Sequence, residues 1–119
     1  MSFELNVKLG DLITKARAHR EDLSGKVELG LKAVGLYFQR ESQKLVPVDT
    51  GALRNSAFTR AEGSGFDTEI SVGYTVNYAI YVHENLTAFH HVGQAKFLEE
   101  PIRTKQREAR RLFARKVGL

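Results

Sequence analysis

Residues 46–56 read VPVDTGALRNS, and this stretch decides the fold because it separates two kinds of sequence pattern. Before it, apolar residues recur at helical steps, whereas short segments typical of β-strands follow it. Pro47 disfavours helix at the residue before it. Asp49 and Thr50 have short oxygen side chains that can cap a new helical turn over residues 51–55. We therefore expect a turn that joins a long helix to a β-hairpin.

The apolar stripe before this stretch predicts either one long helix or two, and we favour two. Its members follow three- and four-residue steps: Leu12, Ala16, Leu23, Val27, Leu31, Val34, Phe38 and Leu45. Gly25 is the natural place for a break. We expect helices over residues 10–22 and 25–45, with Asp11 as the cap of the first and Ser24 as the cap of the second.

Two short segments after residue 56 predict the hairpin. Residues 57–61 and 68–74 flank the Gly-rich turn EGSGFD at residues 62–67. The second segment alternates apolar with polar or small residues, as a strand with one buried face does. Its apolar members are Ile70, Val72 and Tyr74, and the others are Glu69, Ser71 and Gly73.

Residues 77–84 are ambiguous between strand and helix. Their β-branched and aromatic content suits a strand, but Tyr78, Tyr81 and Val82 share one helical face, and we favour a short helix. A polar loop follows, and helical periodicity then resumes at Phe97 and continues to the end of the chain. Pro101 lies in the first turns of this last helix or splits a short turn from it.

These elements place a β-hairpin between a helical N-terminal half and a C-terminal helix. A chain of 119 residues fits a single domain over residues 1–119. Apolar residues make up 42% and charged residues 27%, as in ordinary globular proteins. The first residues, MSFELNVKLGDL, contain no apolar signal core, and no stretch reaches the roughly 20 apolar residues of a membrane span. We expect no export and no membrane partner.

Candidate chemistry is sparse in this sequence. The chain has no cysteine, which excludes disulfides, thiolate metal sites and cysteine nucleophiles. The histidines and carboxylate of the segment 83–91, namely His83, Glu84, His90 and His91, match no spaced zinc pattern. We interpret these histidines as surface or interface residues of a loop, with a metal site as the lesser alternative. Paired carboxylates such as Glu99 and Glu100 diverge on a helix and do not straddle a substrate bond. We expect no enzyme activity and no cofactor.

Positive charge is concentrated at the C-terminal end. The net charge is +4, and residues 101–119 hold seven Lys or Arg against one Glu, so the first 100 residues sum to −2. This charge complements the negative end of a C-terminal helix, which is the reading we favour. The alternative is a nucleic-acid-binding protein that uses the basic C-terminal helix, with Arg107, Arg110 and Arg111 as candidate phosphate contacts. No aromatic residue is interleaved on the basic side for base stacking.

Three blocks in this order resemble the small head–tail connector, tail-completion or minor-capsid (neck) proteins of long-tailed double-stranded DNA bacteriophages. They are VPVDTGALRNS at residues 46–56, VGY at 72–74 with YAIYVHE at 78–84, and KFLEEPI at 96–102. The resemblance covers residues 25–119. One departure is the segment NLT at residues 85–87, where the family more usually has a glycine-threonine pair.

The resemblance implies an α+β fold, with a small antiparallel β-sheet packed against one long helix of the N-terminal half, and with a C-terminal helix. It also implies a non-enzymatic structural subunit of the virion, present in the host cytoplasm before assembly. Such a subunit forms or completes a ring at the head–tail joint or tail end, and its partners are copies of itself, the portal or adaptor, and the tail tube. The residues of the three blocks become candidates for structural or interface roles: Asp49, Thr50, Gly51, Leu53, Arg54, Tyr78, Tyr81, Val82, Glu84, Phe97, Leu98 and Pro101. In the first block we expect Gly51 to permit tight chain passage, Leu53 to enter the core and Arg54 to pair with a carboxylate.

Overall fold

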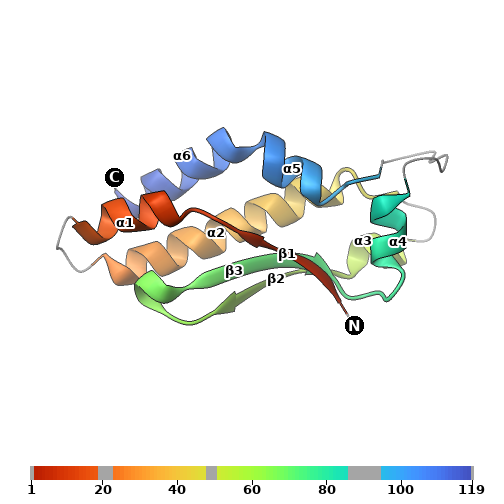
Figure 1. Ribbon diagram of the computed structural model, residues 1–119, viewed down its shortest axis with the longest axis horizontal. Coiled ribbons are helices and arrows are strands. Elements are labelled where there is room, and N and C mark those ends of the chain that lie inside the picture. Colours follow the sequence, from red (N-terminus) through yellow and green to blue (C-terminus); the bar gives the residue numbers. More distant parts are fainter. Residues whose placement is uncertain (1, 19–22, 48–50, 86–94, 119) are drawn as a thin grey trace.

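The computed structural model describes residues 2–18, 23–47, 51–85 and 95–118 (Figure 1). The elements in chain order are β1 (Phe3–Val7), α1 (Gly10–Ala18), α2 (Ser24–Gln43), α3 (Ala52–Asn55), β2 (Ala57–Glu62), the 3-10 turn η1 (Gly65–Asp67), β3 (Glu69–Tyr74), α4 (Ala79–Glu84), α5 (Glu99–Thr104) and α6 (Gln106–Val117). The predicted α+β class, the long helix, the antiparallel sheet and the C-terminal helical region are all present.

Helix α2 lies between two layers, the sheet on one side and α6 on the other (Figure 1). Its apolar stripe supplies the buried residues Val27, Leu31, Val34 and Phe38, each at most 2% exposed. Gly35 lets the sheet approach closely, because a Cβ atom there would come within 2.6 Å of Thr59 Cγ2. The stripe read from the sequence is therefore the core face of α2.

The sheet has the strand order β1-β3-β2, and both pairings are antiparallel. The β2–β3 hairpin confirms the prediction, while β1 is a strand that the sequence analysis did not anticipate. Strands β1 and β2 flank β3 on both edges, and two of the three residues expected to face solvent, Ser71 and Gly73, are buried, whereas Glu69 is exposed. Ser71 is only 7% exposed, and its hydroxyl hydrogen-bonds with the Asn6 side chain of β1. The expectation of a half-buried β3 was therefore wrong for Ser71 and Gly73 and correct for Glu69.

The two predicted N-terminal helices are confirmed, but neither expected cap is correct. Helix α2 begins at Ser24, and the carbonyl of the preceding residue, Leu23, accepts the Val27 N–H at 2.8 Å. Gly25 is thus inside the helix, and residues 19–22 lie outside the described residues. Asp11 lies within the first turn of α1, where its carboxylate pairs with Arg110 of α6.

The C-terminal helical region is divided into α5 and α6 at Lys105, whose φ and ψ of −105° and 23° interrupt the helix. Pro101 is the third residue of α5, where its missing N–H leaves no helical hydrogen bond unmade. Pro101 lies in the first turn of a helix, and that helix, α5, is short and separate from α6. Each of the two expectations for Pro101 is therefore confirmed in part. The short helix favoured for residues 77–84 is also confirmed as α4. Within the described ranges, no helix combines the length and apolar character needed to cross a membrane.

Candidate assembly surfaces

The VPVDTGALRNS stretch forms the junction between α2 and the hairpin. Gly51 has a φ of 84°, in the left-handed region, and its carbonyl accepts the Asn55 N–H at 2.9 Å, which closes the turn of α3. Leu53 is buried in the core, as expected. The Ser56 carbonyl accepts the Thr75 N–H at 3.2 Å, which ties the junction to the end of β3. Asp49 and Thr50, the expected caps, lie outside the described residues.

Arg54 does not pair with a carboxylate within the described residues. Its side chain is exposed, and its backbone carbonyl accepts a hydrogen bond from the Gln43 side chain at 3.0 Å. The junction is therefore held mainly by backbone hydrogen bonds and by the burial of Leu53. These contacts give the stretch a structural role in setting the direction of the chain after α2.

Phe97 and Leu98 are fully buried, and Pro101 is also buried, so this group of candidates belongs to the core. The Phe97 ring meets Tyr74 edge-on at a centroid distance of 5.2 Å. Burial raises the pKa of Tyr74 to about 12, and its hydroxyl shares a 2.6 Å hydrogen bond with Ser42 of α2. Through this cluster the third block of the sequence is joined to α2 and to the sheet.

His83 is a buried core residue within α4, which corrects the expectation of a surface histidine in a loop. Its side chain is 2% exposed, and its ring lies 4.7 Å from Phe3 and 5.0 Å from Phe97. The reason is β1, which was not anticipated and which places Phe3 over the imidazole. His90 and His91 lie outside the described residues.

The chemistry of His83 follows from its partners. Nε2 accepts the Glu99 N–H at 3.1 Å, so the proton of the neutral ring is assigned to Nδ1, which lies 3.7 Å from the Glu84 carboxylate. Burial lowers the pKa of His83, because the charged form loses its hydration. Nε2 therefore already accepts a hydrogen bond from within the protein. No group of three or more metal-capable side chains occurs in the parts of the chain that the structure describes.

The α4 surface, defined as Tyr78, Ile80 and Tyr81, is the first group of exposed large apolar side chains. These residues are 43%, 40% and 76% exposed. Tyr78 and Tyr81 were candidates from the sequence, Ile80 was not, and Val82 is half-buried against the core. Glu84 is exposed beside this surface and forms an ion pair with Lys96, which lowers the pKa of the carboxyl. Helix α4 lies at one end of the molecule (Figure 1), and the exposed rings of Tyr78 and Tyr81 are at its start and within it.

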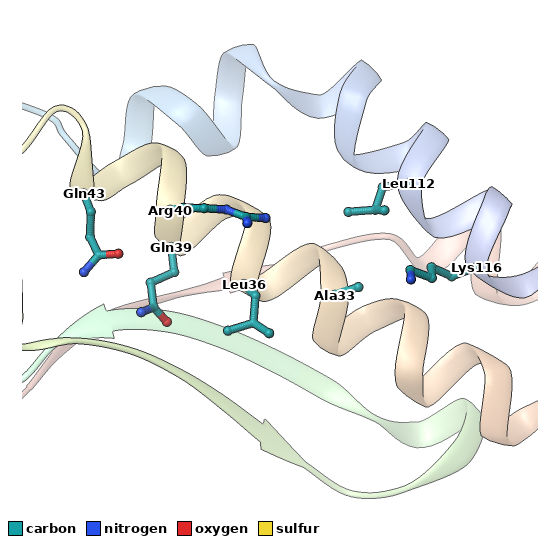
Figure 2. Close-up of a pocket in the computed structure, with 7 residues that line it drawn as sticks. All are labelled: Ala33, Leu36, Gln39, Arg40, Gln43, Leu112 and Lys116. Atoms are coloured by element: carbon teal, nitrogen blue, oxygen red, sulfur yellow. The ribbon is translucent and has the colours of Figure 1, made fainter.

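The outer face of α2 carries the second group, which sequence reasoning missed. Leu29 is 64% and Leu36 is 55% exposed, and the two residues are seven positions apart on the side of α2 away from the core. A groove of about 440 Å³ runs between this face and α6 (Figure 2). Its lining residues are Ala33, Leu36, Gln39, Arg40, Gln43, Leu112 and Lys116. We call this region the α2–α6 groove.

The chain matches no protein-family model, no curated protein and no solved structure.

The three candidate phosphate contacts on α6 differ in whether they have an ion-pair partner among the described residues. Arg107 and Arg111 are exposed, and neither forms an ion pair with another described residue. Arg110 instead donates to both carboxylate oxygens of Asp11, with one Nη1–Oδ1 distance of 3.1 Å. That hydrogen bond lowers the pKa of Asp11 and anchors α1 to α6. Arg110 therefore has a partner within the protein, whereas Arg107 and Arg111 keep their charge available to solvent.

Proposed function

We propose that this protein is a non-enzymatic structural subunit of a tailed-phage particle, which forms or completes a ring at the head–tail joint or tail end. The observation that carries the proposal is the gathering of exposed large apolar side chains on two separate surfaces. Leu29 and Leu36 lie on α2, and Tyr78, Ile80 and Tyr81 lie on α4. Grouped apolar side chains on a small protein are typical of protein–protein contact sites.

Two separate surfaces suit a ring subunit because each copy must contact a neighbour on either side. A simple two-fold dimer requires only one self-complementary surface. Tyrosine is enriched at interface centres, since its ring buries a large area while its hydroxyl tolerates water. Tyr81, which is 76% exposed, has this character. The surfaces thus support self-assembly, and the three sequence blocks support the particular class of assembly.

The blocks also make structural sense in such a subunit. The first block turns the chain between α2 and the hairpin, and the third packs Phe97 beneath α4 against His83. The second block contains Tyr78 and Tyr81, which are exposed. Two blocks therefore hold the scaffold while the middle one offers contact residues. The proposed partners are further copies of this chain together with the portal or adaptor and the tail tube, within the virion.

Electron microscopy and mass photometry test this proposal on the full chain, alone and mixed with portal or tail-tube proteins. We expect rings or ring-bound complexes. The matched variants are Tyr81→Asp, which alters an exposed interface candidate, and Glu62→Ser, an exposed position at the end of β2. Only the first should reduce assembly. Complete absence of rings and of particle association under all these conditions would refute the proposal.

A second candidate function is nonspecific phosphate binding, favoured by one observation on α6. Arg107, Arg111 and Arg115 are all exposed and follow one another at four-residue steps along the same side of the helix. A row of this kind can follow a nucleic-acid backbone without reading its sequence.

Titration with duplex DNA at increasing salt tests this second function. Binding should weaken steeply with salt and disappear when Arg107, Arg111 and Arg115 are replaced by Ala, while Arg110 keeps its contact with Asp11. The matched control replaces three exposed lysines elsewhere, Lys8, Lys26 and Lys32, and changes the net charge equally. Equal loss of DNA binding in both triple variants would mean that binding depends only on the overall charge. Absence of binding at low salt would exclude the function.

A further inference from the structure

We infer that the α4 surface of one copy docks in the α2–α6 groove of the next copy. The inference rests on the proposed function and deepens it by assigning the contact between neighbouring subunits. The contact is heterologous, because each copy contributes its α4 surface to one neighbour and its groove to the other. The partner is thus a second copy of this chain, and the contact chemistry is an aromatic helix surface against an aliphatic groove.

Apolar character matches on the two sides. Four of the five large apolar side chains that are strongly exposed among the described residues belong to these two surfaces: Leu36, Tyr78, Ile80 and Tyr81. The fifth, Leu29, lies outside the groove lining, seven positions before Leu36 on the same face of α2. On the groove side, Ala33 and Leu36 of α2 and Leu112 of α6 supply the aliphatic side chains of the lining (Figure 2). On the other side, Tyr81 is the most exposed of the group at 76%. An exposed ring entering an aliphatic groove buries apolar area on both partners, which favours association.

Charge also matches across this pairing. Arg40 and Lys116 line the groove together with neutral residues, and neither forms an ion pair with another described residue. Beside α4 the carboxylates of Glu84 and Glu99 share one ammonium group, that of Lys96, so this ion-pair cluster has one more negative than positive charge. Opposite potentials across an interface favour the correct pairing and disfavour others.

The same charges disfavour the symmetric alternative. A groove-to-groove dimer would bring Arg40 and Lys116 of both copies together without a carboxylate among the groove residues to balance them. Joining the α4 surface to the groove avoids this repulsion.

The positions of the two surfaces agree with a ring. Helix α4 lies at one end of the 50 Å long axis of the molecule, while α2 and α6, whose residues line the groove, run along that axis (Figure 1). Because the two surfaces differ in place and direction, each docking step adds a copy in the same rotational sense. A repeated heterologous contact closes into a ring when the rotation fits and otherwise continues as a helix.

The test uses two variants that each damage one surface. Tyr81→Asp removes the aromatic ring from the α4 surface and leaves the groove intact. Leu36→Asp introduces a charge in the groove and leaves the α4 surface intact. We expect each variant alone to raise the dissociation constant of self-assembly by about tenfold or more, because the damaged surface is required in every contact. Circular dichroism melting must show that both variants remain folded.

An equal mixture of the two variants is the decisive sample. The intact α4 surface of the Leu36→Asp copy meets the intact groove of the Tyr81→Asp copy, so the mixture forms one-to-one dimers that cannot grow. Analytical ultracentrifugation should detect these dimers under conditions where each variant alone is monomeric. If Tyr81→Asp alone still dimerises, the contact is groove-to-groove, and the inference is overturned.

Cross-linking locates the contact independently, since the chain contains no cysteine. Ala33→Cys lines the groove and Ile80→Cys lies on the α4 surface, and both leave Leu36 and Tyr81 in place. A short bis-maleimide should join Ala33→Cys to Ile80→Cys in a mixture and yield no product from either variant alone. Glu62→Cys, exposed on β2, is the control that should not react with either.

The outcomes separate this inference from the proposed function. If wild-type rings form, but the two Asp variants assemble like wild type and the cysteines do not cross-link, the pairing is wrong and the ring function stands. Absence of wild-type self-association up to the solubility limit also overturns the pairing, while rings formed on portal or tail-tube partners would still support the function. Absence of every kind of ring refutes both.

Discussion

The inner and outer faces of α2 are both apolar, yet they are in opposite environments. Val27, Val34 and Phe38 on the inner face are fully buried, whereas Leu29 and Leu36 on the outer face are 64% and 55% exposed. The inner residues account for the fold, because the sheet and α6 pack against them. The outer leucines contribute little to that core. In the proposed assembly, one helix would serve both the fold and the contact with a neighbouring copy.

The largest effect is expected on the inner face. Phe38→Ala should lower the free energy of unfolding by about 3–5 kcal/mol, because the lost ring leaves a cavity in a packed core. Urea unfolding monitored by circular dichroism measures this change. Leu36→Ala is the matched control on the outer face, and its cost should stay within about 0.5 kcal/mol. Equal costs for the two variants would contradict the contrast between the faces.

A polar contact on the inner face should give the next largest effect. Ser42→Ala leaves the Tyr74 hydroxyl buried without its 2.6 Å hydrogen bond, and we expect a cost of about 1–3 kcal/mol. The double variant Ser42→Ala with Tyr74→Phe removes both polar groups and should recover part of that loss. A double-mutant cycle in urea measures the coupling. If the double variant loses more unfolding free energy than the two single variants lose together, the buried hydrogen bond is not the cause.

Helix α4 shows the same contrast, because His83 is buried and Tyr81 is exposed. The pH dependence of stability tests the buried residue, His83. The pKa of His83 is lowered in the folded protein from an ordinary value of 6.5, so the unfolded chain binds the proton more readily. The contribution of neutral His83 is complete above pH 6.5 and is lost as pH falls from there through the folded pKa. Unfolding free energies of wild type should decrease over this range more than those of His83→Gln. Parallel pH profiles for the two proteins would exclude this role of the imidazole.

The smallest effect on stability is expected when the outer face of α2 is made polar. The double variant Leu29→Ser with Leu36→Ser should keep its unfolding free energy within about 0.5 kcal/mol of wild type, since both side chains are already largely hydrated. Sedimentation velocity should nevertheless show a loss of self-association. A large loss of stability would mean that the outer leucines belong to the core after all.

Local patterns accounted for most of the fold, and a long-range pairing accounted for what was missed. The hairpin of β2 and β3 was predictable because a short Gly-rich turn joins its strands. The pairing of β1 with β3 joins Phe3 to Tyr74, and no local pattern reports a partner so distant in sequence. Missing β1 led directly to the wrong environment for Ser71 and His83, since β1 covers both.

The candidate surfaces were predictable only in part. Tyr78 and Tyr81 share a helical face, but the sequence does not indicate whether that face is buried or exposed. Leu29 and Leu36 fall outside the apolar stripe, and that deviation was the signal that could have identified them. The groove depends on how α6 packs beside α2, which is tertiary information.

The placement of β1 also constrains the order in which this chain folds. Strand β1 is separated from its partner β3 by a long segment of chain that includes α1, α2, α3 and β2. Closing this segment costs more chain entropy than closing the short β2–β3 turn. The hairpin and α2 can therefore form while β1 still samples other conformations. We expect the docking of β1 to be a late step in refolding, and with it the covering of the His83 imidazole by the Phe3 ring.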